Sequence, residues 1–589
     1  MDVFSVVISL LLLFLSVSSP YVNGNLVLDI QCSFVVLNMA TCLSFVTIGS
    51  QVDKPDTLCC SGLKTVLDKK AECLCVGLKK SASMGIKVNI TKAATLPTVC
   101  KLDAPPTTAA CSLSSNPPAS MTGERYVYRI DLTVEEGTIW WHAHSQWARA
   151  TVHGAFIVYP KRGSSYPFPK PHREIHLILG EWWKKKNVMD IAGNANKTGG
   201  EPAISDAYTI NGQPGYHYPC SKPDTFTMKV VRHRRYLLRI INAVMDEELF
   251  FAIANHTLTV VAKDGLYLKH FHTSYLMITP GQSMDVLLHA NQRSGRYFMA
   301  ARAYSSAFGA GFDKTTTTAV LKYKGYHHSL TDESNRKTLV LPYLPPYNHT
   351  EATTRFTNQF RSYRTSNRPV NVPLKIDTRL LYAISVNLLN CSDDKPCSGP
   401  FGKRFSSSVN NISFVNPTVD ILGAYYRRIG GVFQEDFPRK PPTEFNYTGD
   451  NLPFPTRSGT KVVVLDFNSS VELVLQGTNV LASDNHPIHL HGYSFFVVGS
   501  GFGNFDRRKD PLKYNLVDPP EETTVGVPRN GWTAVRFIAN NPGQWILYTS
   551  VTLLNLQSDT KHVACRKKNT GMVVALPYRG MVVESSKGN

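Results

Sequence analysis

The chain has 589 residues, of which 43% are hydrophobic, and a formal net charge of +19. This length is too great for one hydrophobic core, so three or four domains are expected, and the hydrophobic content argues against a disordered chain. The charge favours an acidic partner, and acidic polysaccharide fits better than nucleic acid because no nucleic-acid recognition motif accompanies it. A solvated basic surface with no partner explains the charge equally well.

The first 24 residues have the pattern of a signal peptide. A short apolar core runs from Val6 to Val17, although the segment before it holds Asp2 and no Lys or Arg. The apolar run is short for a membrane span, so secretion to the extracellular space is expected. Eight Asn-x-Ser/Thr triplets agree with secretion as candidate glycosylation sites. They are Asn89, Asn196, Asn255, Asn348, Asn390, Asn411, Asn446 and Asn468.

Eight of the twelve cysteines are concentrated in one short segment near the N-terminus, which indicates a disulfide scaffold. The segment includes an adjacent pair and a Cys-x-Cys, and the sequence at Thr57–Leu67 and Lys69–Lys79 is helix-like. The eight are Cys32, Cys42, Cys59, Cys60, Cys73, Cys75, Cys100 and Cys111.

This cysteine spacing resembles the plant non-specific lipid-transfer proteins over residues 25–118. The family fold, a helical bundle stapled by four bridges around an apolar tunnel, implies that the segment holds a fatty-acyl chain. A disulfide scaffold without a ligand is the alternative. The family pairing implies bridges Cys42–Cys59 and Cys60–Cys100, with Cys32 and Cys111 taking Cys73 and Cys75 in either order.

Residues 104–120 are rich in Pro, Ser, Thr and Ala, which predicts a linker. Beyond them, short β-rich segments separated by Gly, Pro and Asp predict an all-β sandwich or barrel. A polar stretch near residues 343–369 is expected to connect two domains. The predicted strands are Glu174–Leu179, Tyr236–Ile241, Leu258–Ala262, Met284–Leu288, Arg296–Ala300, Thr316–Tyr323, Ser408–Phe414 and Lys461–Leu475.

Two segments carry histidines at strand spacing. His142 and His144 are two residues apart in TIWWHAH, and His489 and His491 are two apart in HPIHLHG, so each pair is expected on one face of a strand. His486 precedes a proline that turns the chain, so its ring can face a second metal centre. Imidazole-rich sites suit copper, zinc, iron or nickel.

The runs TIWWHAHSQWARATVHGAFIVYP, SDAYTINGQPG, YLLRIINAVMDEELFFAIANHTLTVVA, DNHPIHLHGYSFFVVGSGFGNFD and DPLKYNLVDPP resemble plant laccases, a branch of the multicopper oxidases. The resemblance extends from about Tyr126 to Trp545. Ascorbate oxidase is a minor alternative, because the last two runs are more similar to laccase.

The resemblance implies three cupredoxin β-sandwiches and a secreted enzyme of the plant apoplast. It implies oxidation of phenols such as monolignols, coupled to reduction of dioxygen to water, as in lignin metabolism. The family holds four coppers, one at a substrate-side Cys-His-His site and three in a cluster with eight histidines. His142, His144, His489 and His491 match cluster ligands, and His486 matches a substrate-side ligand. The family has no ligands at His270 and His272, which are expected in a solvated loop.

The chain departs from this pattern in two places. The family's His-Trp-His-Gly block is absent, so the first sandwich survives only as final strands within residues 126–159. After Asn541-Pro542-Gly543-Gln544-Trp545, the sequence Tyr548-Thr549-Ser550 stands where the family has His-Cys-His. His562 and Cys565 have the wrong order and spacing to replace that block. The family's usual partner for Cys220 lies in the missing part, whereas Cys391 and Cys397 are expected to pair.

The expected fold is therefore mainly β, with cupredoxin-like Greek-key sandwiches, the first of them truncated, after a small disulfide-rich helical bundle. The expected function is a laccase (benzenediol:oxygen oxidoreductase) impaired by the lost ligand blocks. The alternatives are an inert secreted lipid-binding or cell-wall protein, a residual copper or zinc binder, and a wrongly joined gene model. The expected segments are a leader 1–24, the cysteine module 25–118, a linker and remnant 119–160, a second sandwich 161–330, a connection 331–410, and a third sandwich 411–580, aberrant from 546.

Overall fold

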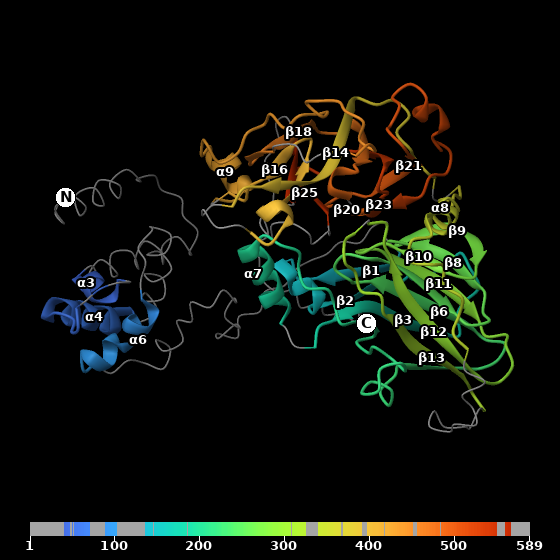
Figure 1. The fold of residues 1–589 in the computed structure, drawn as a ribbon, viewed down its shortest axis with the longest axis horizontal. Coiled ribbons are helices and arrows are strands. Elements are labelled where there is room, and N and C mark those ends of the chain that lie inside the picture. The colour runs from blue at the N-terminus through green and yellow to red at the C-terminus, as the bar shows by residue number, and fades with distance from the viewer. Residues whose placement is uncertain are drawn as a thin grey trace. The chain divides into compact units, whose positions relative to one another are not determined.

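The structure is a computed structural model. It describes residues 41–47, 50, 52–70, 89–102, 136–144, 146–184, 187–307, 309–325, 340–366, 369–391, 397–417, 419–450, 456–482, 484–549 and 560–566. The predicted leader and linker lie outside these ranges, as do Cys32, Cys73, Cys75 and Cys111. The chain divides into two compact units, residues 1–129 with 581–589, and residues 130–580 (Figure 1).

The first unit contains three described helices, α3 (Leu43–Val46), α4 (Thr57–Lys70) and α6 (Ile90–Val99). Helix α4 confirms the helix predicted at Thr57–Leu67, and Asp56 stabilises its first turn by accepting the amide of Cys59 at 2.6 Å. The predicted bridges Cys42–Cys59 and Cys60–Cys100 are both present. Together with buried apolar side chains they form the small core of this unit.

The second unit begins with a two-stranded antiparallel ribbon, β1 (Gly137–His142) and β2 (His153–Val158). The segment between them contains a 3₁₀ turn, Gln146–Ala150. Strand β1 packs against strands of the following sandwich, which fixes the end of the ribbon that carries His142.

The next domain is a sandwich of a five-stranded and a six-stranded sheet, with strand orders β10-β7-β12-β13-β5 and β4-β3-β6-β11-β8-β9. The inward faces of the two sheets form the largest apolar core of the protein. Helix α7 (Val188–Thr198) lies between β3 and β4 in the chain, and helix α8 (Thr350–Thr357) follows β13. The strands are β3 (Arg173–Trp182), β4 (Ala207–Ile210), β5 (Thr227–Val230), β6 (Arg235–Asn242), β7 (Glu248–Ile253), β8 (Leu258–Lys263), β9 (Leu266–Thr273), β10 (Leu276–Ile278), β11 (Ser283–His289), β12 (Arg296–Tyr304) and β13 (Thr316–Tyr323).

The last domain is a second sandwich, of an eight-stranded and a five-stranded sheet, with orders β17-β16-β15-β14-β19-β24-β21-β22 and β18-β26-β25-β20-β23. Helix α9 (Ile421–Arg427) lies outside the sheets (Figure 1). The strands are β14 (Thr378–Leu389), β15 (Arg404–Val409), β16 (Ile412–Phe414), β17 (Arg457–Gly459), β18 (Val462–Asp466), β19 (Ser470–Gly477), β20 (His486–Leu490), β21 (Phe495–Phe502), β22 (Glu521–Glu522), β23 (Thr524–Val527), β24 (Gly531–Ile538), β25 (Gly543–Thr549) and β26 (Thr560–Arg566).

The structure differs from the expected organisation in two details. Strands β14 and β15 belong to the eight-stranded sheet, so the last sandwich includes part of the span 331–410 that was expected to be a connection. His270 and His272 are exposed, as expected, but they lie on strand β9 and not in a loop. No described helix is long and apolar enough to cross a membrane.

Candidate metal centre

The two predicted histidine pairs meet in the second unit. His142 ends β1, and His489 lies near the end of β20, far along the chain. The ring centres of His144 and His491 are 5.0 Å apart, those of His489 and His491 are 4.9 Å apart, and those of His142 and His144 are 5.9 Å apart. We refer to these four residues as the histidine cluster. Strand spacing alone predicts two separate histidine pairs. The structure shows that the two pairs lie next to each other.

Burial keeps the cluster in the form that binds metal. Desolvation is the largest cause lowering the pKa of His142 and His489 to about 4 and that of His491 to about 3. The pKa of His144 is lowered by the same cause. Near neutral pH the four imidazoles are therefore uncharged, and only an uncharged ring nitrogen coordinates a metal ion.

Hydrogen bonds select which ring nitrogen is available. The Nδ1 atom of His489 lies 2.8 Å from the carbonyl of Thr523, and Nδ1 of His142 lies 3.0 Å from the carbonyl of Ala143. Because a carbonyl only accepts, each Nδ1 carries the proton and each Nε2 keeps its lone pair. Two of the four rings thus present Nε2 as the ligand atom.

The cluster does not form a complete coordination sphere for one ion. Within the described ranges, no three His, Cys, Asp or Glu side chains are placed to hold a single metal ion. Each pair of rings could give two nitrogen ligands to one metal ion, and imidazole nitrogen suits copper. The remaining coordination positions of such an ion would need other ligands.

The strand register shows which residues of β25 lie beside the strand that carries His486 and His489. Strand β20 pairs with β25, so that Ile488 is opposite Thr549 and His489 is opposite Tyr548. Positions 548 and 549, where the family has part of its His-Cys-His block, are thus next to the histidine segment, but they carry no histidine or thiolate. Burial lowers the pKa of His486 to about 4, so this ring too is neutral.

The register also places the two residues considered as substitutes. Strand β26 pairs with β25, so that His562 is opposite Ile546 and Cys565 is opposite Gly543. Gly543 is six residues before Thr549, which corresponds to about 20 Å along a strand. Cys565 is therefore not at the position of the missing thiolate.

The second domain donates no histidine but holds the first pair in place. On β1, the indole of Trp140 donates to the carbonyl of Gly281 at 2.9 Å, and the hydroxyl of Ser283 donates to the carbonyl of Thr138. The hydroxyl of Thr138 also donates to buried Asp285. These bonds fix the strand that leads directly into His142.

The same turn of the second domain also holds the second pair. The side-chain amide of Gln282 donates to the carbonyl of Thr524 at 2.7 Å, and Asp264 accepts the amides of Thr523 and Thr524 at 3.3 Å. Thr523 is the residue whose carbonyl orients His489. Residues 281–283 therefore contact β1, which carries His142, and β23, which pairs with the strand of His489, and we call this stretch the bridging turn.

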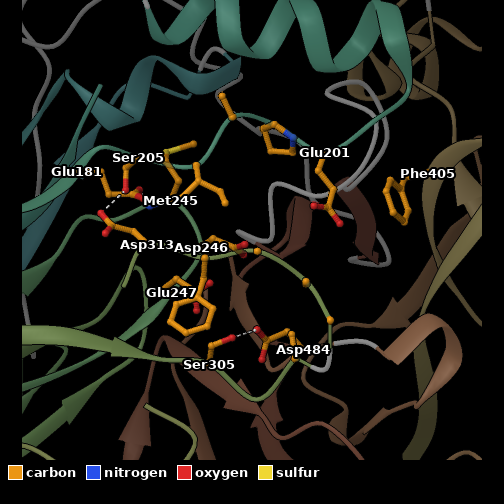
Figure 2. A pocket seen from close by; sticks show the side chains of 18 of the residues that line it. Glu181, Glu201, Ser205, Met245, Asp246, Glu247, Ser305, Asp313, Phe405 and Asp484 are labelled. Carbon is orange, nitrogen blue, oxygen red and sulfur yellow. Dashed lines mark hydrogen bonds between the residues drawn. The ribbon is translucent and has the colours of Figure 1, made fainter. Parts of the chain in front are cut away.

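An acidic cavity of about 260 Å³ opens close to the segment that leads into His486. Its wall includes Asp484, which accepts the hydroxyl of Ser305 at 3.0 Å and the amide of Ser306 at 2.9 Å. Figure 2 shows Glu181, Ser205 and Asp313 on one side of the cavity and Phe405 on the other. The apolar part of the wall includes Trp147, Trp183, Met245, Phe312, Phe405 and Leu481.

Glutamates of the cavity have raised pKa values. Burial raises the pKa of Glu181 to about 7 and that of Glu247 well above its ordinary value, with nearby carboxylates adding to the effect. The hydroxyl of Tyr208 is buried at this wall and has no hydrogen-bond partner among the described residues. No motif in the sequence predicts this cavity. Its only signal was a run of acids, Asp246-Glu247-Glu248, after a buried strand.

The remaining predicted residues are placed as follows. Cys391 and Cys397 form the expected bridge, and Cys220 is exposed and free. Most of the candidate glycosylation asparagines are exposed, whereas three are half-buried. The half-buried ones are Asn89, Asn196 and Asn411.

Comparison with known families covers most of the chain. Models described as multicopper oxidase match residues 113–163, 173–326 and 436–554, and one described as probable lipid transfer matches residues 12–111. The lipid-transfer match spans the cysteine module that was predicted from its spacing.

Several curated plant proteins are similar to this chain. Laccase-14 of Arabidopsis thaliana is 83% identical over 429 residues, which cover 73% of this chain and 74% of that protein. Laccase-12 of the same species is 50% identical, over 72% of this chain and 74% of that protein. Laccase-3 of Oryza sativa subsp. japonica is 48% identical, over 72% and 75%.

Solved structures support the fold. The laccase from Botrytis aclada aligns with a TM-score of 0.51 and 22% identity, covering 73% of this chain and 70% of that one. Fet3p, a multicopper oxidase that functions in iron import, aligns with a TM-score of 0.53 and 20% identity, covering 73% and 72%. The mainly β, cupredoxin-like fold expected from the sequence is thereby confirmed, and the identity to the plant proteins places this chain in the laccase family of multicopper oxidases.

Proposed function

We propose that the histidine cluster holds copper and that the chain oxidises phenols at the adjacent acidic cavity with reduction of dioxygen to water. The observation that carries the proposal is the meeting of two distant His-x-His pairs as buried, neutral rings. Bound copper supplies one-electron redox chemistry, and imidazole is a suitable ligand for it. The family carries four coppers, and four of its eight cluster histidines support only part of that complement.

The proposed electron-entry site is incomplete. His486 is present, but the neighbouring strand carries Thr549 where the family has its cysteine. A thiolate tunes the potential of copper that cycles between two oxidation states, and a threonine hydroxyl does not replace it. We therefore expect turnover well below that of a family member with all its ligand blocks. The alternative of an inert wall protein is disfavoured by the identity to curated laccases.

The acidic cavity is the proposed phenol site. Its aromatic and aliphatic walls pack against a ring, and its carboxyl groups accept a hydroxyl hydrogen. Oxidation of a phenol releases the hydroxyl proton, and a carboxyl group with a pKa near 7, such as that of Glu181, is suited to receive it at neutral pH. Asp484 links this wall to the chain segment that carries His486.

Copper binding by the cluster is tested by titrating the metal-free full chain with copper and measuring the bound metal. Replacing His489 and His491 by Ala should abolish most uptake. The matched control is His270→Ala with His272→Ala, a second His-x-His pair that is exposed on β9. Equal uptake by both variants would contradict the assignment.

Activity is tested by dioxygen consumption with a monolignol-type phenol, together with the absorption spectrum of the copper-loaded chain. We expect no intense blue absorption and slow, copper-dependent consumption. An intense blue band would contradict the incomplete electron-entry site, and consumption that survives copper removal would contradict the oxidase itself.

The first unit carries a second proposal. We propose that it holds a fatty-acyl chain, because the lipid-transfer match and the two described bridges agree with that family's framework. Binding of a fluorescent fatty acid should persist in a metal chelator and be lost in a Cys60→Ser variant. Secretion to the apoplast is proposed from the leader and the asparagine triplets, and a glycosidase-sensitive mass of the secreted chain tests it.

A further inference from the structure

One end of the second domain carries an unusual concentration of positive charge. Strand β5 turns into β6 through Arg232, His233 and Arg234, and the turn is followed by Arg235; all four side chains are exposed. The turn is held rigidly, since the amide of His233 donates to the carbonyl of Ala290 at 2.7 Å and the amide of Ala290 donates to the carbonyl of Arg234 at 2.9 Å. The charges are thus presented on a fixed scaffold.

Neighbouring strands extend this charge across the sheet. Lys229 on β5 is in register with Lys322 on β13, which is in register with Arg296 on β12. The amide of Lys324 donates to the carbonyl of Val230 at 2.7 Å, which brings a further lysine to the same end. Like charges on directly opposed residues destabilise a sheet, so the pairing of Lys229 with Lys322 is maintained at a cost in stability.

The strands and turns that form this surface carry no acidic side chains of their own. The segments 226–236, 286–297 and 319–325, which form it, contain no Asp or Glu. Among the described residues, none of its seven principal cations takes part in an ion pair. We call these seven residues the basic face: Lys229, Arg232, Arg234, Arg235, Arg293, Lys322 and Lys324.

We propose that the basic face binds a linear polysaccharide that carries carboxylate groups. Adjacent strands lie about 4.8 Å apart, so cations on several strands and on one turn match a polymer with repeated charges better than one small anion. The guanidinium groups of Arg232, Arg234 and Arg235 suit carboxylates because each can donate two parallel hydrogen bonds. The net charge of +19 adds attraction at longer range.

The partner follows from this chemistry and does not depend on copper. A polyuronate relieves the repulsion between Lys229 and Lys322 and offers a carboxylate to each arginine of the turn. Nucleic acid is the less favoured polyanion because no base-reading motif accompanies the face. Anchoring on such a polymer needs no contribution from the histidine cluster.

The test uses the full chain and immobilised polygalacturonate, with fully methyl-esterified polymer as the uncharged comparison. The variant replaces Arg232, Arg234 and Arg235 by Gln. The matched control replaces three consecutive exposed cations, residues 507–509, by Gln. That control run has acidic neighbours, since Arg507 pairs with Glu444 and Lys509 pairs with Asp506.

We expect the basic-face variant to lose about tenfold in affinity for polygalacturonate, as three exposed ion pairs of ordinary strength would give. The control variant, which loses the same net charge, should change far less. The binding should weaken with salt and be absent on the esterified polymer. Equal losses in both variants, binding to the esterified polymer, or equally tight binding to duplex DNA would overturn the proposal.

Discussion

Replacing Glu248 by Gln should change how the stability of the protein depends on pH. The carboxyl of Glu248 is 4% exposed and accepts hydrogen bonds from Thr279 at 2.9 Å and Asn485 at 2.8 Å. Desolvation is the largest cause that raises its pKa from 4.5 to about 7, and Asp484 adds to the effect. The hydrogen bonds oppose the rise without cancelling it.

The sign of the effect follows from proton binding. Below pH 4.5 the carboxyl is protonated in both the folded and the unfolded chain, so it contributes nothing. As the pH rises from 4.5 to 7, the unfolded chain releases this proton while the folded chain retains it, which lowers the free energy of unfolding. At about 1.4 kcal/mol per pH unit, the total loss is about 3 kcal/mol for Glu248 in the wild type.

The Glu248→Gln variant has no such proton, so its free energy of unfolding should gain about 3 kcal/mol relative to wild type between pH 4 and pH 8. The measurement is urea unfolding of both proteins at several pH values in the presence of a chelator. Comparing differences across pH removes any constant effect of the changed hydrogen bond to Asn485. A difference between the two proteins that stays the same at every pH would refute the buried, raised carboxyl.

Three further changes test the framework around the site. Gln282→Ala leaves the carbonyl of Thr524 buried without its donor, so urea unfolding should show a loss of about 1–3 kcal/mol and copper titration a weaker affinity. Asp285→Ala leaves fully buried Arg239 without one of its carboxylates, and unfolding should lose about 3–5 kcal/mol, with much of it recovered in a double variant that also replaces Arg239 by Met. Cys60→Ser should destabilise the first unit by about 2–5 kcal/mol in a thermal scan and leave the copper titration unchanged.

Most of the fold could be predicted because its strands carry strong local signals. The prediction at Thr316–Tyr323 coincides with β13, and the other predicted strands of the second domain lie inside observed ones. Two predicted strands are each split in two by a turn, at Asn410-Asn411 and at Asn468. These asparagines have positive φ, which Asn tolerates better than most residues. A strand prediction based on apolar content alone does not detect such a turn.

The candidate site could be predicted only in part. The spacing of His489 and His491 predicts a shared face, but the meeting of this pair with His142 depends on how three domains pack. The residues that enforce that packing, Gln282 and Asp264, are ordinary polar residues in the sequence. Their importance comes from burial and from partners more than 200 residues away, as in the bond from Gln282 to Thr524.

The contacts of the bridging turn explain why the histidine cluster is assembled in a chain that lacks half of the family's cluster ligands. Thr138, Trp140 and Thr524 are held by protein hydrogen bonds, so the positions of the rings do not depend on a metal ion. A preformed site loses little conformational entropy when it binds a ligand. The copper affinity should therefore be set mainly by how many side chains coordinate the ion. Saturating copper should then raise the unfolding temperature in proportion to the logarithm of its concentration without changing backbone circular dichroism. A large gain of β signal on copper addition would show that the metal, and not the second domain, organises the cluster.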